Sequence, residues 1–185
     1  MIARLMIAAV MLWPLAAGAA EWRVIAKDSH LGFQGTQAGS SFDGIFPAFD
    51  AAIRFDPDHL DQASVTVTID LSKAESGNAD RDSALGQPEW FHVKTYPTAQ
   101  FVSQSFRKTA ADQYEASGKL TLKGVTHQIV LPFTLKITGA VAHMTGAVTL
   151  NRHDFNVGEG QWGSDQWVGK DVVVTVKLTA ERAGN

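Results

Sequence analysis

The sequence predicts an all-β protein, either a closed antiparallel barrel or a sandwich, and three observations support this. Apolar and polar residues alternate at period two in about nine or ten runs at near-regular spacing. Two of the connections, Lys123-Gly124 and Gly139-Ala140, carry glycine where two-residue hairpin turns need it. In residues 72–90 the period-two alternation stops and the segment is polar, which favours a single helical insertion. The length of 185 residues fits one domain.

The runs on either side of the two turns, within residues 118–150, fit one register. A slip by one residue would turn every apolar side chain to the wrong face, so the register is well specified. Pro132 interrupts it, because proline donates no ladder hydrogen bond and implies a bulge or an unpaired edge. The expected pairs are Leu122 with Val125, Leu120 with His127, Gly118 with Ile129, Ile137 with Ala142, Leu135 with Met144, Phe133 with Gly146, Leu131 with Val148 and Ile129 with Leu150.

The remaining strands are expected before and after this central stretch. In residues 99–106 the alternation is unclear, with Phe101 on one face and Val102 and Phe106 on the other. Pro47 suggests a kink before the strand that it precedes. The runs lie at residues 22–25, 29–33, 49–55, 63–71, 99–106 and 172–180.

Two segments are expected to be irregular or helical. A short surface helix is predicted at residues 78–85, closed by Gly86 and followed by Pro88. Residues 151–170 hold four glycines and two tryptophans, which predicts a loop with its own packing rather than a tight turn.

Residues 1–20 have the composition of a secretory signal: Arg4, an apolar run broken by Pro14, and small residues before Ala20. Cleavage before Ala20 or Glu21 would leave the domain 21–185 as a soluble periplasmic protein. Its charge would be near −4, because removal of Arg4 leaves 15 basic residues against 19 acidic ones. No basic run suggests nucleic-acid binding, and the absence of cysteine excludes disulfides and thiolate metal sites.

The residues that could carry catalysis do not form a recognisable set. None of the six histidines has HxH or HExxH spacing, and His127 and His143 fall on opposite strand faces. No GxSxG motif occurs, and the glycines around Glu159 precede a tryptophan rather than a helix. We therefore expect no enzyme activity, no metal and no cofactor.

The large supply of apolar residues has two interpretations. The strand faces and the loop aromatics could fill the interior completely. Alternatively, a barrel of this size could enclose a cavity for one apolar ligand. Periodicity alone leaves both open.

The order of several motifs resembles the YceI-like family of exported lipid-binding proteins, over nearly the whole chain after the signal. A departure is Lys123, at a position where the family often has asparagine before glycine. The motifs are Trp22, Asp28–Phe33, Phe42–Phe46, Arg54–Asp56, Asp80–Asp82 with Leu85, Trp90-Phe91, Tyr96-Pro97, Phe101, Gly118–Thr126 and Asn151–Phe155.

The resemblance implies an extended lipocalin-like antiparallel β-barrel with a short helical insertion near one end. It also implies a hollow that binds a polyisoprenoid, quinone-like or fatty-acyl lipid, with no catalytic residue. The expected lining is Phe33, Phe46, Phe49, Ile53, Val67, Ile69, Trp90, Phe91, Phe101, Leu120, Leu122, Ile129, Leu131, Phe133, Leu135, Met144, Gly146, Val148, Trp162 and Trp167.

The resemblance also suggests a second hypothesis. Residues 158–169 are similar to those of family members fused to a membrane di-haem cytochrome b domain. The chain could then be an accessory domain, without a cavity, for a membrane cytochrome b, a quinone system or an envelope-stress system. Candidate partners are accordingly a lipid, a membrane cytochrome b or another envelope protein, and a second copy in a homodimer.

Overall fold

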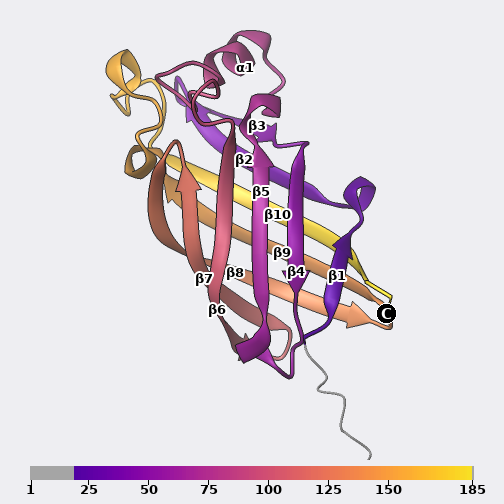
Figure 1. Cartoon of the computed structure of the whole chain (residues 1–185). Helices are drawn as coiled ribbons and strands as arrows, with labels where there is room; N and C mark the ends of the chain where they lie inside the picture. Colours follow the sequence, from indigo (N-terminus) through magenta and orange to yellow (C-terminus); the bar gives the residue numbers. More distant parts are fainter. Residues whose placement is uncertain (1–18, 185) are drawn as a thin grey trace, which may run out of the picture.

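The computed structural model describes residues 19–184, so the predicted signal segment 1–20 lies outside the described residues except for its last two. Within this range the chain forms ten strands, one α-helix and five short 3-10 helices (Figure 1). The strands are β1 (Glu21–Val24), β2 (His30–Gln37), β3 (Ser40–Ile45), β4 (Phe49–Arg54), β5 (Ser64–Asp70), β6 (Thr98–Ala110), β7 (Gln113–Leu122), β8 (Val125–Thr138), β9 (Val141–Asn151) and β10 (Asp171–Arg182). The helices are α1 (Ala79–Leu85), η1 (Ala26–Asp28), η2 (Leu60–Gln62), η3 (Leu71–Lys73), η4 (Arg152–Phe155) and η5 (Gly160–Trp162).

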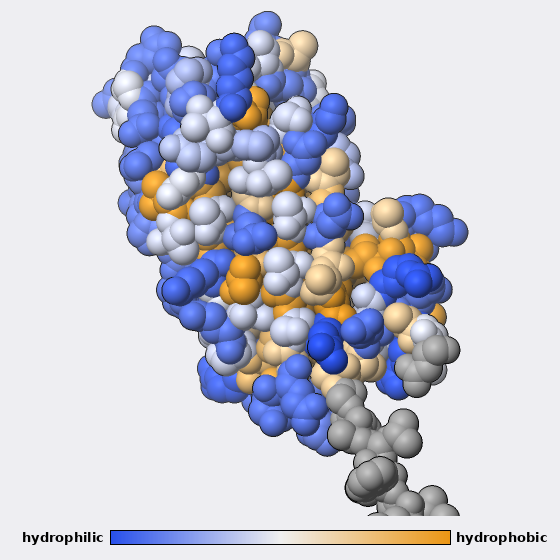
Figure 2. Space-filling model, viewed as in Figure 1, coloured by the Kyte–Doolittle hydropathy of each residue, from blue (hydrophilic) through white to orange (hydrophobic). Residues whose placement is uncertain are grey.

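Eight strands close an antiparallel barrel in the order β1-β4-β5-β6-β7-β8-β9-β10, and β10 returns to β1. The last part of β10 pairs with β1, as in Val24 opposite Ala180, while its first part pairs with β2, as in Phe33 opposite Val174. The β2–β3 hairpin therefore extends the sheet beyond the closed barrel. The predicted all-β barrel is confirmed, and polar residues cover most of the outer face seen in Figure 2.

The two predicted hairpin turns are confirmed. Lys123 and Gly124 have φ of 50° and 77°, the pair of positive values that a type I′ turn requires. Gly139 has φ of 61° at the first position of its turn. All three pairs predicted between β7 and β8, and the three next to the second turn, including Phe133 with Gly146, occur in the structure.

Two predicted pairs, Leu131 with Val148 and Ile129 with Leu150, are wrong, because the β8–β9 ladder ends at Phe133 and Gly146. The Leu135 N–H donates to Asp112 O on the β7 side. Since backbone groups alternate in direction along a strand, the nitrogen of Pro132 faces β9 and offers it no donor. The two strands separate here, and η4 packs between them, with Phe155 against the ring of His127. We call this opening the β8–β9 seam.

The unclear alternation of β6 comes from a β-bulge. Ser103 pairs with Gly118 and Ser105 with Ser117, so Gln104 is an extra residue on β6. The extra residue restores Phe106 to the same face as Phe101. The expectation that these two rings lie on opposite faces is therefore wrong. Of Phe101, Val102 and Phe106, only Val102 faces outward, at 40% exposure.

The predicted helix is confirmed as α1, which begins after Asn78 and ends before Gly86. The Asn78 side chain accepts a hydrogen bond from the Arg81 N–H, which caps the helix. Figure 1 shows α1, the β2–β3 hairpin and the segment 152–170 together at one end of the barrel, here called the α1 end. The opposite end, called the far end, holds η2 and the turns 111–112 and 139–140.

Candidate functional site

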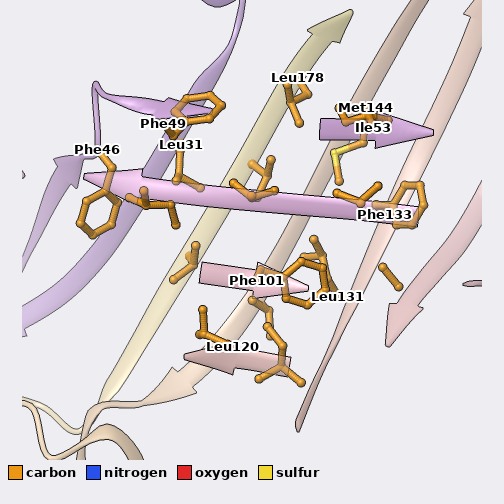
Figure 3. A pocket seen from close by; sticks show the side chains of 18 of the residues that line it. Leu31, Phe46, Phe49, Ile53, Phe101, Leu120, Leu131, Phe133, Met144 and Leu178 are labelled. Atoms are coloured by element: carbon orange, nitrogen blue, oxygen red, sulfur yellow. The ribbon is translucent and has the colours of Figure 1, made fainter. Parts of the chain in front are cut away.

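An apolar cavity of about 220 Å³ lies inside the barrel. Every residue that lines it is apolar, and the nitrogen of Trp22, the lone polar side-chain atom among them, already donates to Phe55 O at 2.9 Å. In Figure 3 the lining side chains show carbon and the sulfur of Met144, without oxygen or nitrogen. A cavity of roughly 150 Å³ with such a lining holds benzene. This cavity can accept an apolar group, but it offers no hydrogen bond to a polar one.

The cavity is elongated along the strands. From β8 alone, Ile129, Leu131, Phe133, Leu135 and Ile137 line it. These positions span eight residue steps, or about 26 Å at a rise of about 3.3 Å per residue. The shape therefore suits an extended chain better than a compact molecule.

Fifteen of the twenty residues expected to line a cavity do line it: Phe46, Phe49, Ile53, Val67, Ile69, Phe91, Phe101, Leu120, Leu122, Ile129, Leu131, Phe133, Leu135, Met144 and Val148. The sequence analysis missed several other lining residues. The missed residues of β10 occupy every second position of the strand, so its period-two pattern could have identified them. The missed residues are Trp22, Leu31, Phe55, Val65, Leu71, Ala99, Phe106, Ala116, Ile137, Ala142, Leu150, Val174, Val176, Leu178 and Ala180.

Two of the expected residues are internal but lie outside the cavity. Phe33 packs between Phe46 and Phe42, at 5.0 and 6.3 Å between ring centroids, and so forms part of the wall. At Gly146 an added Cβ would lie 2.8 Å from Pro132 O. This glycine makes room for a backbone carbonyl, so it is not an opening beside the ring of Phe133.

The three expected tryptophans lie at the α1 end, away from the cavity. Trp90 and Trp162 contact each other at 5.9 Å between ring centroids, and the buried nitrogen of Trp90 has no hydrogen-bond partner among the described residues. Trp167 is 64% exposed. Together with Trp162 and Arg81 it borders an outer hollow of about 320 Å³, which shares no residue with the barrel cavity.

At the far end, the rings of Phe106 on β6, Tyr114 on β7 and Phe133 on β8 gather around Phe55, which follows β4. Phe55 lies 5.3 Å from Phe106, 5.8 Å from Tyr114 and 6.3 Å from Phe133, measured between ring centroids. Tyr114 stacks on Phe133 at 5.5 Å. Phe55, Phe106 and Phe133 line the cavity while Tyr114 lies behind them. We call these four residues the ring cluster.

At the α1 end, Arg152 holds the segment 152–170 in place. Its side chain is 2% exposed, and burial lowers the pKa of its guanidinium, which Asp165 partly offsets. A buried arginine with five donors needs acceptors for all of them. It donates to Val157 O at 2.9 Å, Gly158 O at 2.8 Å, Trp162 O at 2.8 Å, Val168 O at 3.0 Å and Gly169 O at 3.1 Å.

Lys123, at the first position of the β7–β8 turn, links this turn to the same segment. Its side chain is 7% exposed, and its ammonium donates to Asn156 O at 2.5 Å and Glu159 Oε2 at 2.8 Å. Lysine at this turn position thus gains polar contacts that a shorter side chain could not reach.

The histidines singled out from the sequence take part in packing and hydrogen bonds. His127 contacts Phe155, and His143 hydrogen-bonds Thr179 Oγ1 at 3.2 Å on the other sheet face, as predicted. Asp165 accepts a hydrogen bond from His153, which lowers the pKa of that carboxyl group. Residues 19–184 contain no group of three potential metal ligands. The absence of activity and of a metal stays a prediction.

In the same range, no helix combines the length and the apolar character that crossing a bilayer would require.

Comparison with known proteins gives a consistent picture. The family model described as "YceI-like domain" matches residues 22–180. A UPF0312 protein of Vibrio cholerae is 34% identical over 128 residues, 68% of each chain. The crystal structure of Burkholderia cenocepacia BcnA has a TM-score of 0.81 and 31% identity, and covers 84% of this chain and 98% of that one. A polyisoprenoid binding domain from Saccharophagus degradans has a TM-score of 0.71 and covers 89% and 99%; at 14% identity it shows the fold alone.

Proposed function

This chain belongs to the YceI-like family, and from that premise we propose that it is a binding protein for a long apolar ligand. The ligand would be a polyisoprenoid, quinone-like or fatty-acyl lipid whose chain lies in the barrel cavity. The observation that carries the proposal is the cavity itself, which is elongated and lined by apolar residues throughout. The Saccharophagus degradans protein is described as polyisoprenoid binding, so the fold itself can hold a ligand of this class.

A carrier of this kind needs no catalytic group, which agrees with the scattered positions of the titratable residues. Burial of the chain supplies the free energy, at about 25 cal/mol per Å² of apolar surface removed from water. Because the cavity has no partner for a charge or a hydroxyl, the polar head of the ligand has to remain outside it. We propose no enzyme activity and no cofactor beyond the lipid.

We also propose export, with cleavage of the signal before Ala20. The Phe55 N–H donates to Ala20 O at 2.9 Å, next to the start of β1. Cleavage before Ala20 preserves this bond, whereas cleavage before Glu21 removes the acceptor. The bond favours the first of the two predicted cleavage sites, whereas the proposal of a periplasmic location rests on the composition of residues 1–20.

The alternative of an accessory domain depended on a filled barrel, and the cavity removes that premise. The exposed ring of Trp167 is the feature that a docking partner could contact. No observation bears on a membrane cytochrome b or on a homodimer, so both stay predictions.

A pair of neighbouring substitutions tests the lipid-binding proposal. Val148 lines the cavity beside the β8–β9 seam, while Thr149 is exposed on the outer face. In Val148→Phe the added ring occupies ligand space, so binding of a fluorescent fatty acid should fall at least about tenfold, or about 1.4 kcal/mol. The melting temperature should stay close to that of the wild type, because the cavity has room for the ring.

Thr149→Phe is the matched control and should bind like the wild type. Unchanged binding in Val148→Phe would contradict the cavity as the site. A collapse of its melting temperature would show that the interior has no space to spare, which also contradicts the proposal.

A further inference from the structure

We propose that the far end of the barrel binds an anionic lipid head, a carboxylate or a phosphate, through the side chains of Arg182 and Lys108. This inference rests on the proposed function and adds to it the charge of the head and the end of the barrel at which the head lies. The apolar chain of the ligand would then extend from the far end toward the α1 end.

Arg182 occupies the next inward-facing position of β10 beyond the apolar lining. Residues that pair across two antiparallel strands have their side chains on the same face of the sheet. Ala180 lines the cavity, and Arg182, two residues further along, pairs with Trp22, which also lines it. The guanidinium carbon lies 5.3 Å from the ring centroid of Trp22. The Arg182 N–H donates to Ala140 O at 2.8 Å, which places the residue at the β8–β9 turn of the far end.

Lys108 occupies the corresponding position on the opposite wall. Phe106 lines the cavity, and Lys108, two residues further along β6, pairs with Tyr114 of the ring cluster. Tyr114 pairs in turn with the lining residue Phe133, so all of these side chains share the inner face. The Lys108 ammonium lies 5.6 Å from the ring centroid of Tyr114. Because β6 and β10 are four strands apart in both directions around the barrel, the two cations approach the far end from opposite sides.

These two inward-facing cations lack the partners that outward-facing cations have. Neither Arg182 nor Lys108 forms an ion pair with any residue of the described range 19–184. Three arginines on the outer face near the same end do have a carboxylate partner: Arg107 with Glu115 at 2.5 Å, Arg23 with Glu181 at 3.7 Å and Arg54 with Glu21 at 3.9 Å.

One carboxylate lies in the surroundings of Arg182 but already has other partners. Asp56 accepts hydrogen bonds from the Asp58 N–H at 3.0 Å and from His59 Nδ1 at 3.1 Å. The bond from Asp58 is the largest cause of the lowered pKa of this carboxyl group, and Arg182 contributes least. The guanidinium therefore stays open to an anion from the cavity.

The α1 end is less suited to an anionic head. Its lining residues Phe46, Leu71 and Phe91 are buried, and α1 and the β2–β3 hairpin lie at this end (Figure 1). The two cations buried there, Arg152 and Lys123, already donate to acceptors of the segment 152–170. An anion that leaves water without a partner costs much free energy, so the head should lie beside the cations that are free.

The experiment compares two ligands of equal chain length that differ in the charge of the head, laurate and dodecanol, by displacement of a fluorescent probe. In the double variant Arg182→Gln/Lys108→Gln, laurate should bind at least about tenfold more weakly, equivalent to about 1.4 kcal/mol. Dodecanol should bind as it does to the wild type. Each single variant should lose part of the laurate affinity, and added salt should weaken the binding of laurate to the wild type, because it screens exposed charges.

A second pair of ligands, farnesyl phosphate and farnesol, distinguishes the two kinds of anion. The pair whose charged member loses more affinity in the double variant identifies the head as a carboxylate or as a phosphate.

Two further double variants serve as controls. Arg107→Gln/Arg23→Gln removes two positive charges from the outer face near the same end and should leave the affinities for both ligands unchanged. Arg182→Lys/Lys108→Arg keeps both inner charges and should bind laurate like the wild type. Melting curves identify any variant that is unfolded, in which case the single variants decide.

Unchanged binding of laurate and farnesyl phosphate in Arg182→Gln/Lys108→Gln would overturn the inference. Equal losses for the charged and the neutral ligands would also overturn it, because they would indicate a change of the cavity and not of the head site. A wild type that binds none of the four ligands would contradict the proposed function instead, so the two failures can be told apart.

Discussion

Single residues at the α1 end illustrate how polar groups support an apolar site. Arg152 is buried beside the barrel and donates to five backbone carbonyls of residues 157–169. Buried carbonyls without donors are costly, so the side chain fixes the path of a glycine-rich segment that has little regular structure. An added Cβ at Gly158 would clash with its guanidinium, which explains a glycine with φ of 77° there.

This role predicts a large effect from a conservative change. Lysine has three donors, so Arg152→Lys leaves at least two carbonyls without a partner, at about 1–3 kcal/mol each. We expect a loss of at least about 2 kcal/mol in the free energy of unfolding, measured in urea. Arg107→Lys, at a side chain that is 70% exposed, is the control and should change it by less than about 0.5 kcal/mol. Equal effects of the two substitutions would show that the carbonyl contacts do not matter.

At the scale of elements, the barrel wall opens at the β8–β9 seam. The two strands pair from Phe133 and Gly146 to their turn, and separate where Pro132 presents no N–H to β9. η4 packs at the seam through Phe155, which is 2% exposed and contacts the ring of His127. One proline thus determines where the sheet opens and where the following segment can pack.

The seam predicts a difference in amide hydrogen exchange along these strands. By the alternation of backbone direction, Val130 on β8 and Thr149 on β9 point their N–H groups into the seam, while Thr134 and Thr145 point theirs at each other across the ladder. Val130 and Thr149 should therefore exchange faster than Thr134 and Thr145, measured by NMR. Equal protection of all four amides would mean that the ladder continues past Pro132 in solution.

Much of the element level could be predicted from the sequence, because turns and alternation are local. The turns at Lys123-Gly124 and Gly139-Ala140 fixed the register of three strands, and Asn78 and Gly86 marked the ends of α1. The unpaired edge predicted at Pro132 occurs where the β8–β9 ladder ends, although the two pairs expected beyond it are wrong. The bulge at Gln104 could not be predicted, because it depends on how a strand meets its neighbour, which period-two alternation does not record.

At the scale of the whole molecule, alternation shows which side chains face inward but not whether they fill the interior. The alternation places Val174 and Val176 on one face of a strand, but only the closed barrel shows that they border a hollow. The loop tryptophans show the opposite error. Trp162 and Trp167 are expected from the sequence to line the cavity, but Arg152 and Lys123 hold their segment over the outside of the α1 end.

The central claim is that the barrel is a container for one apolar chain, and native mass spectrometry of the protein purified from the periplasmic fraction tests it most directly. The account predicts a polypeptide that begins at Ala20 and carries one noncovalent lipid per chain, which is released on denaturation. The lipid should be missing from Val148→Phe and present in Thr149→Phe purified in the same way. A bare polypeptide in every preparation, which also fails to take up added isoprenoid or fatty-acyl lipid, would contradict the account.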